Sequence, residues 1–130
     1  MVLTDTHKRT IDYIRISVTD RCNLRCIYCM PEDGILMKTH EEILRFDEII
    51  RLAEILAELG IKKVKITGGE PLVRKNVAAL IKDLKTVSGI EQVTLTTNGI
   101  LLEELLEDLI QAGIDGINVS LDTLDEELYR

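Results

Sequence analysis

The chain has 130 residues, of which 45% are hydrophobic and 30% are charged, a balance typical of a globular domain and not of a disordered or fibrous chain. Sixteen basic and 23 acidic residues give a formal net charge of −7, which disfavours general binding to nucleic acid or to an anionic membrane. No apolar run is long enough for a transmembrane helix or a signal peptide, so we expect a cytoplasmic protein with neither partner.

Strands and helices are predicted to alternate along the chain. Strands are expected at residues 13–19, 63–67, 92–96 and 116–121, and helices at residues 47–59, 76–86, 101–112 and from 125 onward. Asn76 is expected to cap the second helix, and Gly60 and Gly113 to end the first and the third. This alternation predicts an α/β protein with a parallel sheet and right-handed crossovers.

Each predicted strand has one apolar and one polar face. In the first strand, for example, Ile14 and Ile16 alternate with Arg15 and Ser17. A doubly wound sheet has two apolar faces, and a closed eight-stranded barrel has an apolar interior. The pattern therefore favours a barrel or open half-barrel with a polar lumen, which is wider than the closed eight-stranded barrel or incomplete. Four βα units cannot close a barrel. We therefore expect the first part of a longer protein, or a half that needs a partner such as a second copy.

All three cysteines lie in the loop after the first predicted strand, as Cys22-x3-Cys26-x2-Cys29. An odd, tight cluster without a secretion signal indicates metal ligation in place of disulfides. Three thiolates suit a [4Fe-4S] cluster that leaves one iron open to a small molecule. The alternatives are a zinc site, which would need a fourth ligand such as His7 or His40, and three unrelated buried thiols.

The loops after the other strands are expected at the same rim, because parallel strands place their carboxyl ends together. They contain Gly-Gly-Glu at residues 68–70, Thr-Asn-Gly at 97–99 and Ser-Leu-Asp at 120–122. Adjacent glycines let backbone groups approach a ligand closely, and Glu70 is placed to receive an ammonium group. Taken alone, the first two loops are also ordinary turns.

The cysteine motif with Tyr28, followed by Gly-Gly-Glu-Pro at residues 68–71, resembles the radical S-adenosylmethionine (SAM) superfamily. Longer strings at residues 20–34, 67–74 and 118–124 are similar to its GTP 3',8-cyclase family (the molybdenum cofactor biosynthesis proteins A), over essentially the whole chain. The resemblance implies a TIM-like partial (βα)6 barrel, of which residues 1–130 hold about the first four βα units. It also implies a lyase that converts GTP to (8S)-3',8-cyclo-7,8-dihydroguanosine 5'-triphosphate, with a cofactor-borne radical and no catalytic side chain.

The resemblance also assigns roles by position. The [4Fe-4S] cluster would be held by Cys22, Cys26 and Cys29, with SAM on its open iron. The residues lining the SAM site would be Tyr28, Gly69, Glu70 and Ser120, with Glu70 near the ammonium group. GTP would contact Arg15, Lys65 and Thr96, which the strand pattern places on the polar face. For the two cations, the alternative is a pair of salt-bridged lumen residues.

The family has a second [4Fe-4S] cluster, held by three cysteines of a C-terminal region. Only three cysteines are present here, so we expect residues 1–130 to be the N-terminal portion of the core domain, without the second-cluster region. A reductant protein would supply the electrons. The alternatives are another radical SAM enzyme, such as a peptide-modifying or activating enzyme, and a non-catalytic metal-binding fragment.

Overall fold

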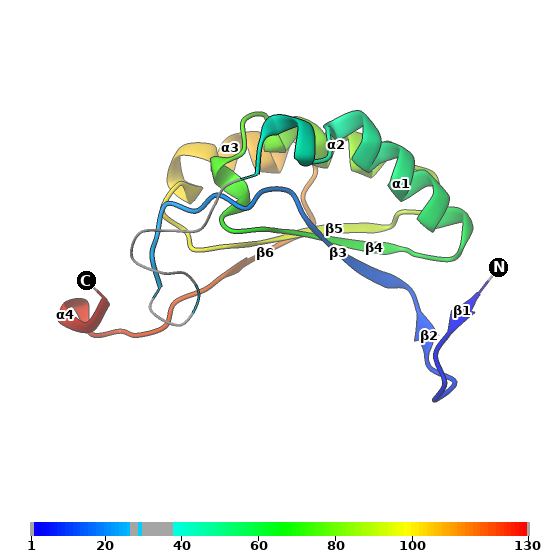
Figure 1. Ribbon diagram of the computed structural model, residues 1–130, viewed down its shortest axis with the longest axis horizontal. Coiled ribbons are helices and arrows are strands. Elements are labelled where there is room, and N and C mark those ends of the chain that lie inside the picture. Colours follow the sequence, from blue (N-terminus) through cyan, green and yellow to red (C-terminus); the bar gives the residue numbers. More distant parts are fainter. Residues whose placement is uncertain (1, 27–28, 30–37, 130) are drawn as a thin grey trace.

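The computed structural model describes residues 2–26, 29 and 38–129. Its centre is a four-stranded parallel sheet in the order β3-β4-β5-β6, covered on one face by three helices (Figure 1). The strands are β3 (Tyr13–Ser17), β4 (Lys63–Thr67), β5 (Gln92–Thr97) and β6 (Gly116–Val119). The helices are α1 (Phe46–Glu58), α2 (Val77–Thr86) and α3 (Leu102–Gln111), with the shorter η1 (His40–Glu42), η2 (Pro71–Val73) and α4 (Glu126–Tyr129). The predicted α/β fold with a parallel sheet is confirmed.

The core lies between the sheet and the helices. The central strands bury Val64, Ile66, Val93 and Leu95, all at most 1% exposed. The helices meet them with the apolar positions of their amphipathic faces, which include Ile49, Ala53, Leu80, Ile81, Leu84 and Leu109. Because strand side chains alternate between faces, the opposite face carries the intervening polar residues. In the described part of the chain, no helix is long and apolar enough to cross a membrane.

The ends of three strands differ from the prediction. β3 ends at Ser17, and Thr19, expected on the polar face, is buried close to the loop after β4, whose Gly69 amide donates to the Thr19 oxygen. Thr97, expected in a loop, is the buried last residue of β5. On β6, Val119 is 53% exposed although the pattern predicted a covered apolar face. The alternation of apolar and polar residues along a strand does not indicate which other segment covers the end of that strand.

Two local features also differ from the sequence prediction. Asn76 precedes α2 in a left-handed conformation (φ 63°), and its side chain makes no capping hydrogen bond. Asparagine tolerates this conformation, and its backbone oxygen, not its side chain, accepts bonds from the first turn of the helix. An N-terminal hairpin, β1 (Leu3–Thr4) with β2 (Thr10–Ile11), was not predicted, since strands this short have no detectable period.

Candidate functional site

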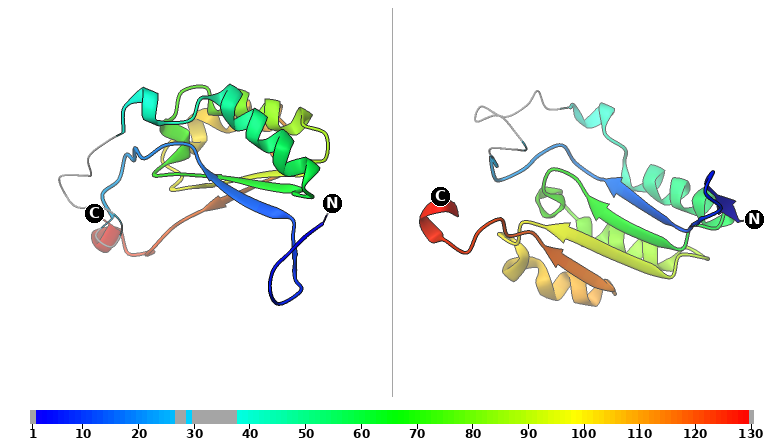
Figure 2. Two further views of the ribbon diagram at one scale, coloured as in Figure 1. Left: turned by 45° about the vertical axis from the view of Figure 1, so that its right-hand side comes forward. Right: turned by 90° about the horizontal axis from the view of Figure 1, so that it is seen from below.

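The loops after β3, β4, β5 and β6 meet at the carboxyl edge of the sheet, where the strand arrowheads point in Figure 2. Backbone hydrogen bonds join them directly. The Gly69 amide donates to the Thr19 oxygen at 2.8 Å, and the Glu70 amide donates to the Arg21 oxygen at 2.8 Å. The Ser120 amide donates to the Thr97 oxygen at 2.9 Å. The prediction of one common rim is confirmed.

The three cysteines are free thiols in the loop after β3. Cys22 and Cys26 are half-buried and Cys29 is exposed. The Cys29 amide donates a hydrogen bond to the Cys26 oxygen at 3.0 Å. Among the described residues, no three His, Cys, Asp or Glu side chains are gathered closely enough to hold a metal ion. The donor set of three thiols on one loop nevertheless has the chemistry that an iron–sulfur cluster requires.

Of the two histidines proposed as a fourth zinc ligand, His7 is excluded by its position in the fold. His7 belongs to the turn of the β1–β2 hairpin, which Figure 1 shows at the opposite end of the sheet from the cysteine loop. A zinc site that combines His7 with the cysteines is therefore wrong. The side chain of His40 and the whole of Tyr28 lie outside the described residues.

The two glycines after β4 pack against the backbone that leads into the cysteine motif. A Cβ atom on Gly69 would overlap the carbonyl oxygen of Arg21 and lie 2.7 Å from its carbonyl carbon. A Cβ atom on Gly68 would lie 2.7 Å from the oxygen of Thr19. The sequence predicted that these glycines let the backbone approach a ligand closely. In the structure they approach the backbone of Thr19 and Arg21. The role of Gly69 in binding SAM stays a prediction.

Glu70 is the most buried charged side chain in the described part of the chain, at 2% exposure. Its Oε1 accepts hydrogen bonds from the Thr97 hydroxyl at 2.6 Å and the Leu72 amide at 3.2 Å. Its Oε2 accepts one from the Asn98 amide at 2.7 Å. A carboxylate accepts about four hydrogen bonds, so one acceptor position remains. The predicted contact with an ammonium group is therefore limited to that position and stays untested.

Asn98 is a rim residue whose sequence context, Thr-Asn-Gly, predicts only a turn. Its side-chain nitrogen donates to the Asn23 side-chain oxygen at 2.7 Å, inside the cysteine loop. Together with Glu70 it connects the loops after β3, β4 and β5. The available signal in the sequence was the polar pair Thr97 and Asn98, which directly follows a predicted strand at the rim that also carries the cysteines.

We expect Glu70→Gln to lower the free energy of unfolding of the full-length apoprotein by about 2 kcal/mol, because an amide nitrogen would face a buried hydrogen-bond donor. Chemical denaturation measures this change. Glu107→Gln on the exposed surface of α3 is the matched control and should leave the stability unchanged. Equal stability of Glu70→Gln and the wild type would contradict this account of the carboxylate.

The three residues predicted to contact GTP share the face of the sheet opposite the helices. Arg15 lies beside Lys65 in the register of β3 and β4, and Thr96 lies beside Asn118 in β5 and β6. The Lys65 Nζ crosses β5 and donates to the Asn118 Oδ1 at 3.0 Å. Among the described carboxylates, none forms an ion pair with either cation. The salt-bridged alternative therefore finds no support there.

Ser120 is the remaining predicted residue of the SAM site. It follows β6 and is exposed, with its amide bonded to the end of β5. The structure thus brings Gly69 and Ser120 to the rim, and leaves Arg15, Lys65 and Thr96 on the adjoining polar face.

Comparison with known proteins identifies relatives of the chain. Residues 16–130 match the Radical SAM superfamily. The chain is 54% identical over 128 residues to the GTP 3',8-cyclase of Petrotoga mobilis, and 55% identical over 128 residues to that of Heliobacterium modesticaldum. Each match covers 98% of this chain, but only 40% and 39% of the two relatives.

A solved structure shares the fold. The crystal structure of BtrN in complex with AdoMet and 2-DOIA superposes with a TM-score of 0.66 at 20% identity, over 93% of this chain and 50% of BtrN. At this identity the likeness concerns the fold alone. The matching residues, the parallel sheet and the cysteine loop at its carboxyl edge lead to one conclusion: the chain belongs to the radical SAM superfamily and contains part of its barrel.

Proposed function

We propose that residues 1–130 are the N-terminal portion of the core domain of a GTP 3',8-cyclase. This lyase would convert GTP to (8S)-3',8-cyclo-7,8-dihydroguanosine 5'-triphosphate in molybdenum cofactor biosynthesis. The observation that carries the proposal is the pair Arg15 and Lys65, adjacent in register on the polar face and without a carboxylate partner among the described residues. The relatives with that name, which match 98% of the chain, support it.

The three thiols would hold a [4Fe-4S] cluster with one iron left for SAM. When bound, the cluster and SAM supply the electron transfer and the radical that removes a hydrogen atom from the ribose of GTP. The role of the chain is to bind and orient both molecules and to exclude water. Gly69, Glu70 and Ser120 would line the SAM site with Tyr28, and their position at one rim supports this assignment.

Arg15 and Lys65 would bind the triphosphate, and Thr96 would contribute a hydroxyl group. Hydrogen bonds between a cationic side chain and a phosphate are stronger than hydrogen bonds between neutral groups. Two cations on neighbouring strands therefore suit a group with several negative charges. Because the lumen face holds no described carboxylate paired with them, their charge is available to a ligand. The chain as a whole is acidic, so only such a local pair can attract an anion.

We expect the double variant Arg15→Ala/Lys65→Ala of the full-length protein to lose GTP affinity by at least about 100-fold, at about 1.5–3 kcal/mol for each charged contact. Cleavage of SAM should persist. Equilibrium binding of GTP and release of 5'-deoxyadenosine measure the two effects. Lys82→Ala on the exposed surface of α2 is the matched control.

Unchanged GTP affinity in the double variant would overturn GTP as the substrate. The assignment would then move to another radical SAM enzyme, such as one that modifies a peptide, since a peptide has no triphosphate. We further propose that a second [4Fe-4S] cluster is held outside these 130 residues. A reductant protein would supply the electrons in the cytoplasm, and a second copy of the protein would form a homodimer.

A further inference from the structure

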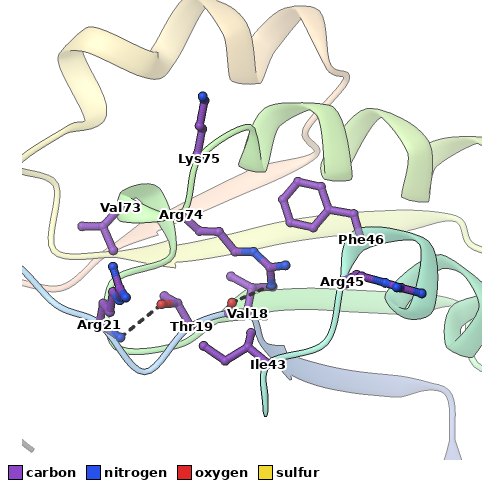
Figure 3. A pocket seen from close by; sticks show the side chains of 9 residues that line it. All are labelled: Val18, Thr19, Arg21, Ile43, Arg45, Phe46, Val73, Arg74 and Lys75. Atoms are coloured by element: carbon purple, nitrogen blue, oxygen red, sulfur yellow. Dashed lines mark hydrogen bonds between the residues drawn. The ribbon is translucent and has the colours of Figure 1, made fainter. Parts of the chain in front are cut away.

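Arg74 bonds both ends of the segment that carries all three cysteines. It follows η2, and its Nη1 donates to the Val18 oxygen at 2.7 Å while its Nη2 donates to the Leu44 oxygen at 2.7 Å. Val18 precedes the cysteine motif, and Leu44 lies shortly before α1. The guanidinium carbon also lies 4.3 Å from the centre of the Phe46 ring (Figure 3). One side chain therefore joins the loop after β4 to the start and the end of the cysteine segment.

The surroundings of Arg74 indicate a positioning role and not charge neutralisation. Its side chain borders a cavity of about 590 Å³, whose walls include Val18, Ile43 and Phe46. Burial lowers the pKa of Arg74 from its ordinary value, although a guanidinium stays charged. No described carboxylate forms an ion pair with it. Two of its donors are instead bonded to backbone oxygens, and the guanidinium lies over a ring, which together define one geometry.

A second contact closes the same segment. The Asp20 Oδ2 accepts a hydrogen bond from the Lys38 amide at 2.6 Å, again between the outgoing and the returning chain. Fixing the two ends of a long loop restricts the conformations available to everything between them. Arg74 differs from Asp20 because it also reaches a third segment, the loop that contains Gly68 and Gly69.

We propose that Arg74 is a positioning residue for the cysteine loop. It closes the base of the loop and holds the loop against the Gly-Gly-Glu segment, so that the cluster and SAM are bound in a fixed relation. The inference rests on the proposed cluster and SAM site, and it does not depend on GTP as the substrate. A lysine would keep the charge but would lack the planar pair of donors and the stacking surface.

The test compares Arg74→Lys and Arg74→Gln in the full-length protein with Arg51→Lys, an exposed arginine of α1 that pairs only with Glu54 among the described residues. Circular dichroism checks that each variant is folded. In the apoprotein, the rate at which a thiol reagent modifies the cysteines should rise about fivefold in Arg74→Lys. In the reconstituted protein, the change in the EPR signal on titration with SAM should give an affinity about tenfold weaker. Arg74→Gln should show larger effects, and Arg51→Lys none.

Wild-type thiol reactivity together with wild-type SAM affinity in Arg74→Lys would overturn the proposal. An Arg74→Lys variant that fails to fold would be replaced by Phe46→Leu, which keeps both hydrogen bonds, removes the stacked ring and should show a smaller rise in thiol reactivity; no rise would overturn the proposal. If the wild-type protein takes up no iron, the proposed function fails, and the thiol reactivity of the apoproteins still decides the role of Arg74.

Discussion

Replacing Cys22, Cys26 or Cys29 with alanine is expected to abolish the cluster proposed for this chain. Residues 1–130 contain only these three cysteines, so no other thiolate among them can take the place of a lost ligand. If the proposed second cluster is present, the iron content of the reconstituted full-length protein should fall by half, from about eight atoms to about four. Cleavage of SAM should fall to background in each variant. Iron and sulfide analysis, with EPR spectroscopy after anaerobic reconstitution, measures the loss.

Ser88→Ala, at an exposed position after α2, is the control and should keep the full iron content. A cysteine variant that keeps all its iron would contradict the assignment of the three ligands. One tightly held zinc ion in the wild type, with no response to SAM, would favour a metal-binding module instead.

Gly69→Ala is expected to be the most damaging substitution outside the cysteines. The new methyl group would overlap the carbonyl of Arg21 and lie 3.0 Å from the Asp20 oxygen, and both are backbone atoms that cannot rotate away. The amide hydrogen bonds from Gly69 to Thr19 and from Glu70 to Arg21 hold the two loops at this separation. We expect the free energy of unfolding to fall by about 3 kcal/mol, and SAM binding to be lost, since the cysteine loop must move outward.

Gly116→Ala is the matched control, because its methyl group would make an ordinary contact with the Thr94 side chain at 3.5 Å. Chemical denaturation of the full-length apoprotein and titration of the reconstituted protein with SAM measure the two effects. Gly69→Ala with the stability and SAM affinity of the wild type would show that the two loops do not need this close packing.

The order of strands and helices and the position of the rim could be predicted because the signals are local. Apolar periodicity and glycine ends identify α1 and α3, and β4 spans the predicted residues 63–67. The cysteine spacing is likewise a local signal, and it indicates metal ligation without a structure. The same local signals predicted one polar face, and the register that places Arg15 beside Lys65 agrees with it.

Contacts between segments far apart in the chain could not be predicted, because they depend on how the strand ends and loops pack against one another. The expected contact of Glu70 with a ligand stays a prediction, but its hydrogen bonds from Thr97 and Asn98 could not be foreseen from the sequence. Nothing near Arg74 in the sequence reveals that its guanidinium bonds the oxygens of Val18 and Leu44. A residue's own neighbours determine its secondary structure, whereas the partner of a buried polar group depends on which strand ends the fold brings together. Local signals were therefore sufficient for the strands of the main sheet, the three longer helices and the candidate ligands, whereas the contacts that hold the loops in place depend on how the loops pack.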